Sequence, residues 1–186
     1  MTDTIPTEAH EEAVKAKRHM PAWLEMVLTV LVAVIIALAV RVFVFEITRV
    51  DGPSMQPTLH TDEQILVNKL AYAFGAAPKR MDIVICRYPG SDVHYVKRVV
   101  ALGGETVSVV NGRVHIDGKP LTDDLGTEPV SESMEPYRVP EGYVFVMGDN
   151  RNDSLDSRQE GPIALSEIIG RATAVVWPLD AIKWLG

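Results

Sequence analysis

The 186-residue sequence contains a single cysteine, Cys86. One cysteine excludes an internal disulfide and any metal site built from several thiolates. Cys86 lies in the run DIVICRY, whose alternating apolar residues predict a buried strand cysteine rather than a reactive one. The sequence also lacks a basic stripe with interleaved aromatic residues, and its formal net charge is −7. Both features argue against nucleic acid as a partner.

Charge is absent from one long segment near the N-terminus, MVLTVLVAVIIALAV, which lies between Glu25 and Arg41. About 20 helical residues cross the hydrocarbon core of a bilayer, so we predict an uncleaved membrane anchor over residues 21–45. A buried core helix fits poorly because nearly every side of the segment is apolar. An A-x-A match at 37–39 also fits a cleavable signal peptide. Cleavage after Ala39 is therefore an alternative to the uncleaved anchor. The apolar residues that continue past position 39 favour the anchor.

The charges that flank the segment predict its orientation. Lys15, Lys17 and Arg18 precede it closely, and the side of a membrane helix that is rich in Lys and Arg usually stays in the cytoplasm. Residues 1–20 then form a cytoplasmic tail, and residues 46–186 form a domain outside the membrane. The length of the chain leaves room for one such domain.

The predicted domain is mostly β. Alternating or β-rich runs lie at 64–70, 81–88, 94–102, 105–110, 113–117, 142–147 and 171–177. Asn111-Gly112 predicts a type I′ hairpin turn. The segment ALSEII at 164–169 predicts one short helical turn capped by Ser166, and the acidic stretch 122–136 predicts a surface loop. We therefore expect an anchored antiparallel β domain, either a sandwich or a partly closed barrel.

A serine lies among prolines just after the anchor, in the stretch DGPSMQPTL. Serine often serves such turns by capping backbone N–H groups. Ser54 could instead be a nucleophile if a neighbouring group took its proton. The residue two positions after it is Gln56 rather than the glycine of a nucleophile elbow. Pro57 stands where an S-x-x-K motif would place lysine.

Lys97 is the better candidate for a base than any histidine. His10 and His19 precede the anchor, and His60, His94 and His115 carry no catalytic cue; strand alternation places His94 on the face opposite Lys97. Lys97 shares a face with apolar residues, where desolvation favours the neutral amine and lowers the pKa. An exposed lysine that protects a sheet edge is the alternative.

The polar run MGDNRNDSLDSR at 147–158 is the third unusual feature. Asp156 and Arg158 are spaced to pair with each other. A hydrogen-bonded loop without chemistry is the simpler interpretation. A calcium loop is excluded because the run has arginines among the potential ligands and lacks the required glycine and final glutamate.

Four motifs, in order, complete the pattern: DGPSMQPTL, MDIVICRYP, YVKRVVALGGE and GDNRNDSLDSR. Together with the anchor they resemble the bacterial type I signal peptidases, in the compact form common in Gram-positive bacteria. The resemblance covers the anchor and nearly all of the outer domain. It implies that Ser54 is the nucleophile and Lys97 the general base.

The resemblance also implies supporting roles. Ser154 would hold the lysine amine by a hydrogen bond, Asp156 and Arg158 would form an ion pair, and Asp149 would support Arg98. Met55 would help to form the substrate pocket. Gly52 stands where some members carry a hydroxyl that donates to the oxyanion, so the second donor is not defined here.

The implied substrates are exported preproteins with small residues at −1 and −3 from the cut. The lipid bilayer and the translocation machinery are the other expected partners, no cofactor is called for, and the expected location is the plasma membrane. Two rivals remain. A self-cleaving repressor-type Ser–Lys protease would need a DNA-binding head, and an anchored β module without activity would not need both Ser54 and Lys97.

Overall fold

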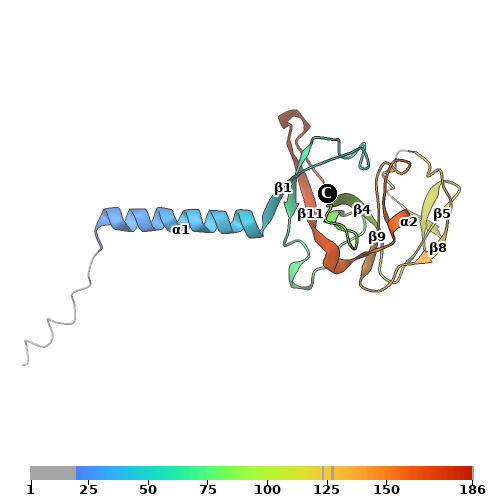
Figure 1. The fold of residues 1–186 in the computed structure, drawn as a ribbon, viewed down its shortest axis with the longest axis horizontal. Helices are drawn as coiled ribbons and strands as arrows, with labels where there is room; N and C mark the ends of the chain where they lie inside the picture. The colour runs from blue at the N-terminus through green and yellow to red at the C-terminus, as the bar shows by residue number, and fades with distance from the viewer. Residues whose placement is uncertain (1–19, 123, 127, 186) are drawn as a thin grey trace, which may run out of the picture. The chain divides into compact units, whose positions relative to one another are not determined.

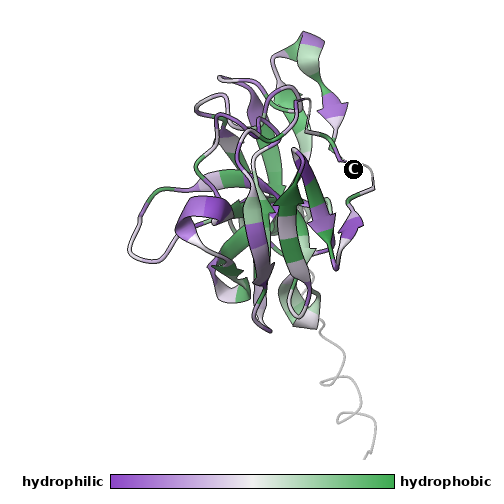
Figure 2. Ribbon diagram, turned by 90° about the vertical axis from the view of Figure 1, so that its right-hand side faces the viewer, coloured by the Kyte–Doolittle hydropathy of each residue, from purple (hydrophilic) through white to green (hydrophobic). Residues whose placement is uncertain are grey.

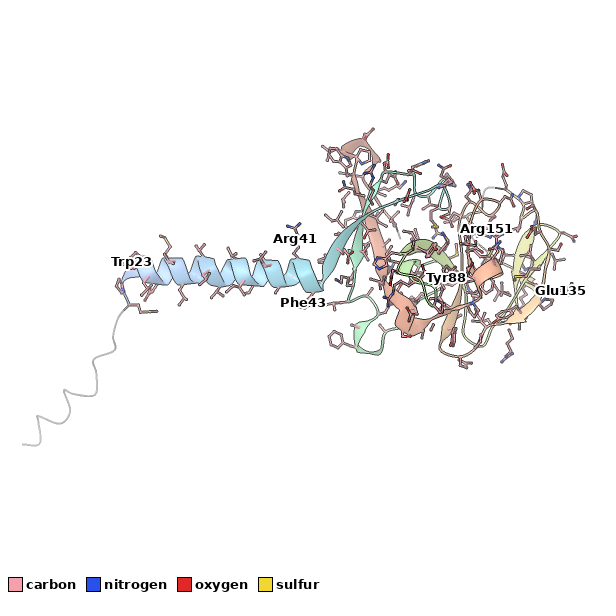
Figure 3. The ribbon with its side chains drawn as sticks, in the orientation of Figure 1. Trp23, Arg41, Phe43, Tyr88, Glu135 and Arg151 are labelled. Atoms are coloured by element: carbon pink, nitrogen blue, oxygen red, sulfur yellow. The ribbon has the colours of Figure 1, made fainter. Side chains whose placement is uncertain are left out.

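The computed structural model describes residues 20–122, 124–126 and 128–185, so the predicted tail lies almost wholly outside them. The chain divides into two compact units after Ala39. The helix α1 (Ala22–Phe43) follows Pro21 and contains neither proline nor glycine. Its side chains project outward all along its length, with Trp23 near one end and Arg41 and Phe43 near the other (Figure 3). Residues 22–41 are long and apolar enough to cross a membrane.

The second unit consists of short strands and helical turns (Figure 1). The strands are β1 (Phe45–Arg49), β2 (Gln64–Asn68), β3 (Ile83–Cys86), β4 (Tyr95–Leu102), β5 (Thr106–Val110), β6 (Arg113–Ile116), β7 (Lys119–Pro120), β8 (Met134–Arg138), β9 (Tyr143–Met147), β10 (Ile163–Ala164), β11 (Ile168–Trp177) and β12 (Lys183–Trp184). A short helix, α2 (Ser157–Glu160), and the 3₁₀ turns η3 (Ala73–Gly75), η4 (Leu165–Glu167) and η5 (Leu179–Ala181) connect them.

These strands form two antiparallel sheets. The larger has the order β1-β2-β11-β3-β4-β9-β10, with β12 paired to β11. The smaller has the order β7-β6-β5-β8, and Figure 1 shows β5 and β8 together at one end of the unit. The long strand β11 thus lies between β2 and β3, although it comes nearly last in the chain.

The large sheet is buried on both faces at β3. Ile83 and Ile85 of β3 pack in one apolar cluster with Met55 and Leu59, whereas Val84 and Cys86 pack in another. Successive strand residues point to opposite faces, so a strand covered on both sides is apolar throughout. Figure 2 shows apolar strands in the interior of the unit and polar segments around them. The region between the two sheets holds a third cluster, which includes Val107 and Phe145.

Most sequence predictions of the fold are confirmed. All seven predicted strands are present, and Asn111 and Gly112 have the positive φ angles of a type I′ turn. Three details were wrong. Phe45 begins β1 rather than ending the anchor. β8 starts within the predicted loop 122–136. Residues 165–167 form a 3₁₀ turn that Ala164, not Ser166, precedes without a side-chain cap.

Candidate active site

Ser54 lies in a compact turn between β1 and β2. The Gln56 N–H donates to the Pro53 carbonyl at 3.0 Å, and the Leu59 N–H donates to the Met55 carbonyl at 2.8 Å. Met55 and Leu59 are buried in the core, which fixes the turn to the sheet. Gly52 enters the turn with a φ of +88°, a backbone conformation that favours glycine. The side chain of Ser54 is left half-buried at the surface of the unit.

Lys97 projects from β4 toward this turn. Lys97 Nζ donates to Ser54 Oγ at 2.8 Å and to the Val96 carbonyl at 3.1 Å. It also lies 5.7 Å from the centre of the Tyr95 ring. Lys97 is only 3% exposed, so the alternative of an exposed edge lysine is wrong.

Burial lowers the pKa of Lys97 below its usual value, because the amine has lost most of its contact with water. Nearby acidic groups act in the opposite direction, and Asp156 has the largest effect among them. Burial prevails. The same strand pair buries the Cys86 thiol and raises its pKa to about 12, as expected of an unreactive strand cysteine.

The polar run 147–158 follows β9 and carries two buried ion pairs. Arg98 donates to both carboxylate oxygens of Asp149 at 2.7 Å. Arg158 donates to both oxygens of Asp156 at 2.8 Å. Asp156 also caps α2 and accepts a hydrogen bond from the Gly148 N–H at 3.0 Å. The two predicted pairings are therefore present, and a helix cap rather than strand alternation sets the second.

The predicted hydrogen bond from Ser154 to Lys97 is absent. Lys97 donates to Ser54 and Val96 instead, and the buried Ser154 hydroxyl has no hydrogen-bond partner in the part of the chain that the structure describes. Ser154 packs against Gly148, where any side chain at position 148 would overlap its Oγ. It thus lies beside Gly148 without a hydrogen bond to the amine.

We expect Asp156→Ala to lower the free energy of unfolding by about 3–5 kcal/mol, because it leaves the guanidinium of Arg158 without its buried partner. It also removes the cap of α2. Urea unfolding in detergent would measure the loss. Arg49→Ala is a matched control: the Arg49–Asp62 pair has a similar 2.7 Å distance, but both side chains are about two-thirds exposed. That change should cost less than about 1 kcal/mol; equal losses would contradict the argument.

Three residues of this loop make contacts near Ser54 that the sequence did not predict. Gly148 lies so close to the Ser54 carbonyl and Ser154 Oγ that a Cβ atom would overlap both. Asn150 hydrogen-bonds the Ser54 turn. Arg151, buried despite its charge, donates to the Gly148 carbonyl and pairs with Asp124 of the acidic loop (Figure 3). The density of polar residues was the only sequence signal, because these contacts join segments far apart in the chain.

A pocket of about 380 Å³ opens over Ser54 and Lys97. Its walls are the end of β1 with the Ser54 turn (48–55), the segment that leads into β4 (93–97), and Asp153 and Leu155. Gly52 and Met55 both line it. His94 lines it too, but it precedes β4, so the strand alternation from which its placement was predicted does not extend to it. No hydrogen bond joins His94 to Ser54 among the described residues.

Comparisons with known proteins identify related chains. Residues 23–177 match the family described as signal peptidase, peptidase S26. The chain is 37% identical to signal peptidase I T of Bacillus subtilis (strain 168) over 90% of this chain and 92% of that one. It is 36% identical to a signal peptidase I of Leptolyngbya laminosa, over 88% and 84% of the two chains.

Among solved structures, a signal peptidase I from Enterococcus faecalis V583 is 30% identical, with a TM-score of 0.46, and covers 51% of this chain and 96% of its own. The family match spans both the apolar helix and the β unit that carries Ser54 and Lys97. The chain therefore belongs to the S26 signal peptidases, membrane-anchored serine peptidases that process signal peptides.

Proposed function

We propose that the chain removes signal peptides with a Ser54–Lys97 dyad, in which Ser54 is the nucleophile and Lys97 the general base. The observation that carries this proposal is the 2.8 Å contact between the Ser54 hydroxyl and a buried amine. A hydroxyl needs a base to become a good nucleophile. Burial makes Lys97 such a base, because it favours the neutral form of the amine.

The reaction proceeds through an acyl-enzyme. Ser54 Oγ attacks the scissile carbonyl as its proton passes to the neutral Lys97 Nζ. The tetrahedral intermediate collapses, the C–N bond breaks, and the Lys97 ammonium returns that proton to the leaving amine. Water then attacks the ester, Lys97 accepts its proton, and Ser54 recovers a proton as the carboxylate product leaves. The Ser54 backbone N–H stabilises the oxyanion in both halves of the reaction.

The proposed substrate is the cleavage segment of an exported preprotein, with small residues at −1 and −3. The end of β1 and the start of β4 border the pocket, and these strand ends favour an extended peptide that binds alongside them by strand addition. The bare Gly52 leaves room for the peptide backbone, since a Cβ there would meet nothing within 4 Å. Met55, almost fully buried, supports the apolar side of the pocket.

The proposed location is the plasma membrane, with residues 1–20 in the cytoplasm and the β unit outside. The excess of Lys and Arg before the anchor supports this orientation. A signal peptide still embedded in the bilayer would present its polar end on the outer side, and the translocation machinery would deliver it there. Ala37 to Ala39 lie within α1, so cleavage after Ala39 would first require that helix to open.

The test is cleavage of a preprotein with an Ala-x-Ala site in detergent–lipid micelles, with both products identified by mass. We expect wild type to cut after the second alanine and Ser54→Ala to cut nothing while remaining folded. Ser131→Ala is the matched control, because Ser131 is exposed and does not line the pocket. Full activity of Ser54→Ala would eliminate Ser54 as the nucleophile. No cutting by folded wild type of several such preproteins would reject the proposed specificity.

A further inference from the structure

Asn150 binds the two carbonyl groups on either side of the Ser54 α-carbon. Its side-chain Nδ2 donates to the Pro53 carbonyl at 3.3 Å, and its backbone N–H donates to the Ser54 carbonyl at 3.0 Å. The Pro53 carbonyl also accepts from Gln56 at 3.0 Å, so both of its lone pairs are used. Asn150 itself belongs to the 147–158 run, far from Ser54 in sequence.

The Pro53 carbonyl and the Ser54 N–H belong to one peptide group. In a planar trans peptide the C=O and N–H point in opposite directions, and the cis bonds of the described chain lie elsewhere, at Gln56–Pro57 and Trp177–Pro178. A hydrogen bond that fixes the Pro53 carbonyl oxygen therefore also fixes the direction of the Ser54 N–H. Because Asn150 holds that oxygen, the Ser54 N–H must point away from Asn150.

The residues that line the pocket indicate that this direction leads toward it. Pro53 and Ser54 line the pocket, whereas Asn150 is not among the described residues that do. No described residue accepts a hydrogen bond from the Ser54 N–H, so this donor is available to a substrate. A donor of this kind stabilises an oxyanion only if it is already oriented before the reaction.

We propose that Asn150 is a positioning residue that fixes the Pro53–Ser54 peptide with its N–H directed at the developing oxyanion. The inference rests on the proposed function of Ser54 and deepens it. Gly52 has no side-chain hydroxyl to act as a second donor. Stabilisation of the oxyanion therefore depends more strongly on the orientation of the Ser54 N–H. Loss of the Asn150 amide would let the Pro53–Ser54 peptide group rotate. Stabilisation of the transition state would then fall more than binding of the substrate.

Asn150→Ala tests this inference. The change is neutral, so the charges around Lys97 stay the same, and the backbone bond to the Ser54 carbonyl is retained. We expect kcat on a preprotein to fall about 10- to 100-fold, below the loss for deleting an oxyanion donor outright. KM and the acid limb of the pH profile should hardly change. Affinity for a peptide aldehyde, whose adduct with Ser54 is tetrahedral, should fall by about the same factor as kcat.

Asn152→Ala is the matched control. Asn152 belongs to the same loop, and its amide likewise donates to a proline carbonyl, that of Pro129 at 3.1 Å, but it does not contact the Ser54 turn. Its aldehyde affinity should equal that of wild type. Asn150→Gln, which restores an amide, should recover kcat and aldehyde affinity together. This second variant also keeps the test decisive if Asn150→Ala is poorly folded.

Two outcomes would overturn the inference: Asn150→Ala with the kcat and aldehyde affinity of Asn152→Ala, or a fall in kcat with unchanged aldehyde affinity. A third result would contradict the proposed function as well. If wild type bound the aldehyde no better than Ser54→Ala, the proposed nucleophile itself would fail, and the role of Asn150 with it. Tight binding by wild type, Asn150→Ala and Asn152→Ala alike would contradict the role of Asn150 alone.

Discussion

Lys97→Met is expected to reduce preprotein cleavage by about 10²- to 10⁴-fold, the usual contribution of a general base. Methionine fills the buried site beside Val96 and Tyr95 but cannot accept a proton from Ser54. Lys97→Arg should be equally inactive, because a guanidinium keeps its charge in proteins and cannot act as the base. Single-turnover rates measured on folded protein would show both losses. Substantial activity in Lys97→Arg would rule out proton transfer to position 97.

The same base predicts the pH dependence. Cleavage requires neutral Lys97, so kcat/KM should rise with pH as that amine loses its proton. Because burial lowers the pKa of Lys97, the rise should occur below the pH at which an exposed lysine titrates. A pH–rate profile over the stable range of the enzyme measures it. A limb near pH 6–7 that disappeared in His94→Ala would assign the base to His94, which also lines the pocket.

Gly148→Ala is expected to have the second large effect. The added Cβ would overlap the Ser54 carbonyl and Ser154 Oγ. Gly148 cannot easily move away, because its N–H donates to Asp156 and its carbonyl accepts from Arg151. The Ser54 turn must shift instead, and a displacement of about 1 Å at a reacting group can cost about 100-fold in rate. We expect a loss of kcat of that order, measured on the fraction of enzyme that remains folded.

Gly170→Ala separates this effect from general destabilisation. A Cβ at Gly170 would meet the Asn68 carbonyl at 2.7 Å, a clash inside the sheet between β11 and β2. Overpacking of this kind costs about 1–3 kcal/mol, so both variants should unfold at lower temperature. Only Gly148→Ala should lose activity per folded molecule. If the two variants kept the same kcat, the Ser54 turn would have absorbed the clash without consequence.

The sequence predicts the local features well and the long-range ones poorly. Strand alternation, the Asn111-Gly112 turn and the uncharged helix depend on neighbouring residues, and each is present apart from its exact boundaries. Ser54 and Lys97 were predicted because four motifs and the apolar segment together resemble a known family, whereas each residue alone also had an ordinary structural interpretation. Gly148 and Asn150 look ordinary in theirs. Their importance arises only when the loop after β9 packs on the Ser54 turn, a contact that no local pattern encodes.

The position of β11 between β2 and β3 has a consequence for when activity appears. A chain synthesised from its N-terminus exposes Ser54 and Lys97 early, but β2 and β3 cannot be joined until residues 168–177 have been made. Pairing between segments so distant in sequence is slow. The peptidase should therefore remain latent throughout its own synthesis and become active only when nearly the whole chain is available.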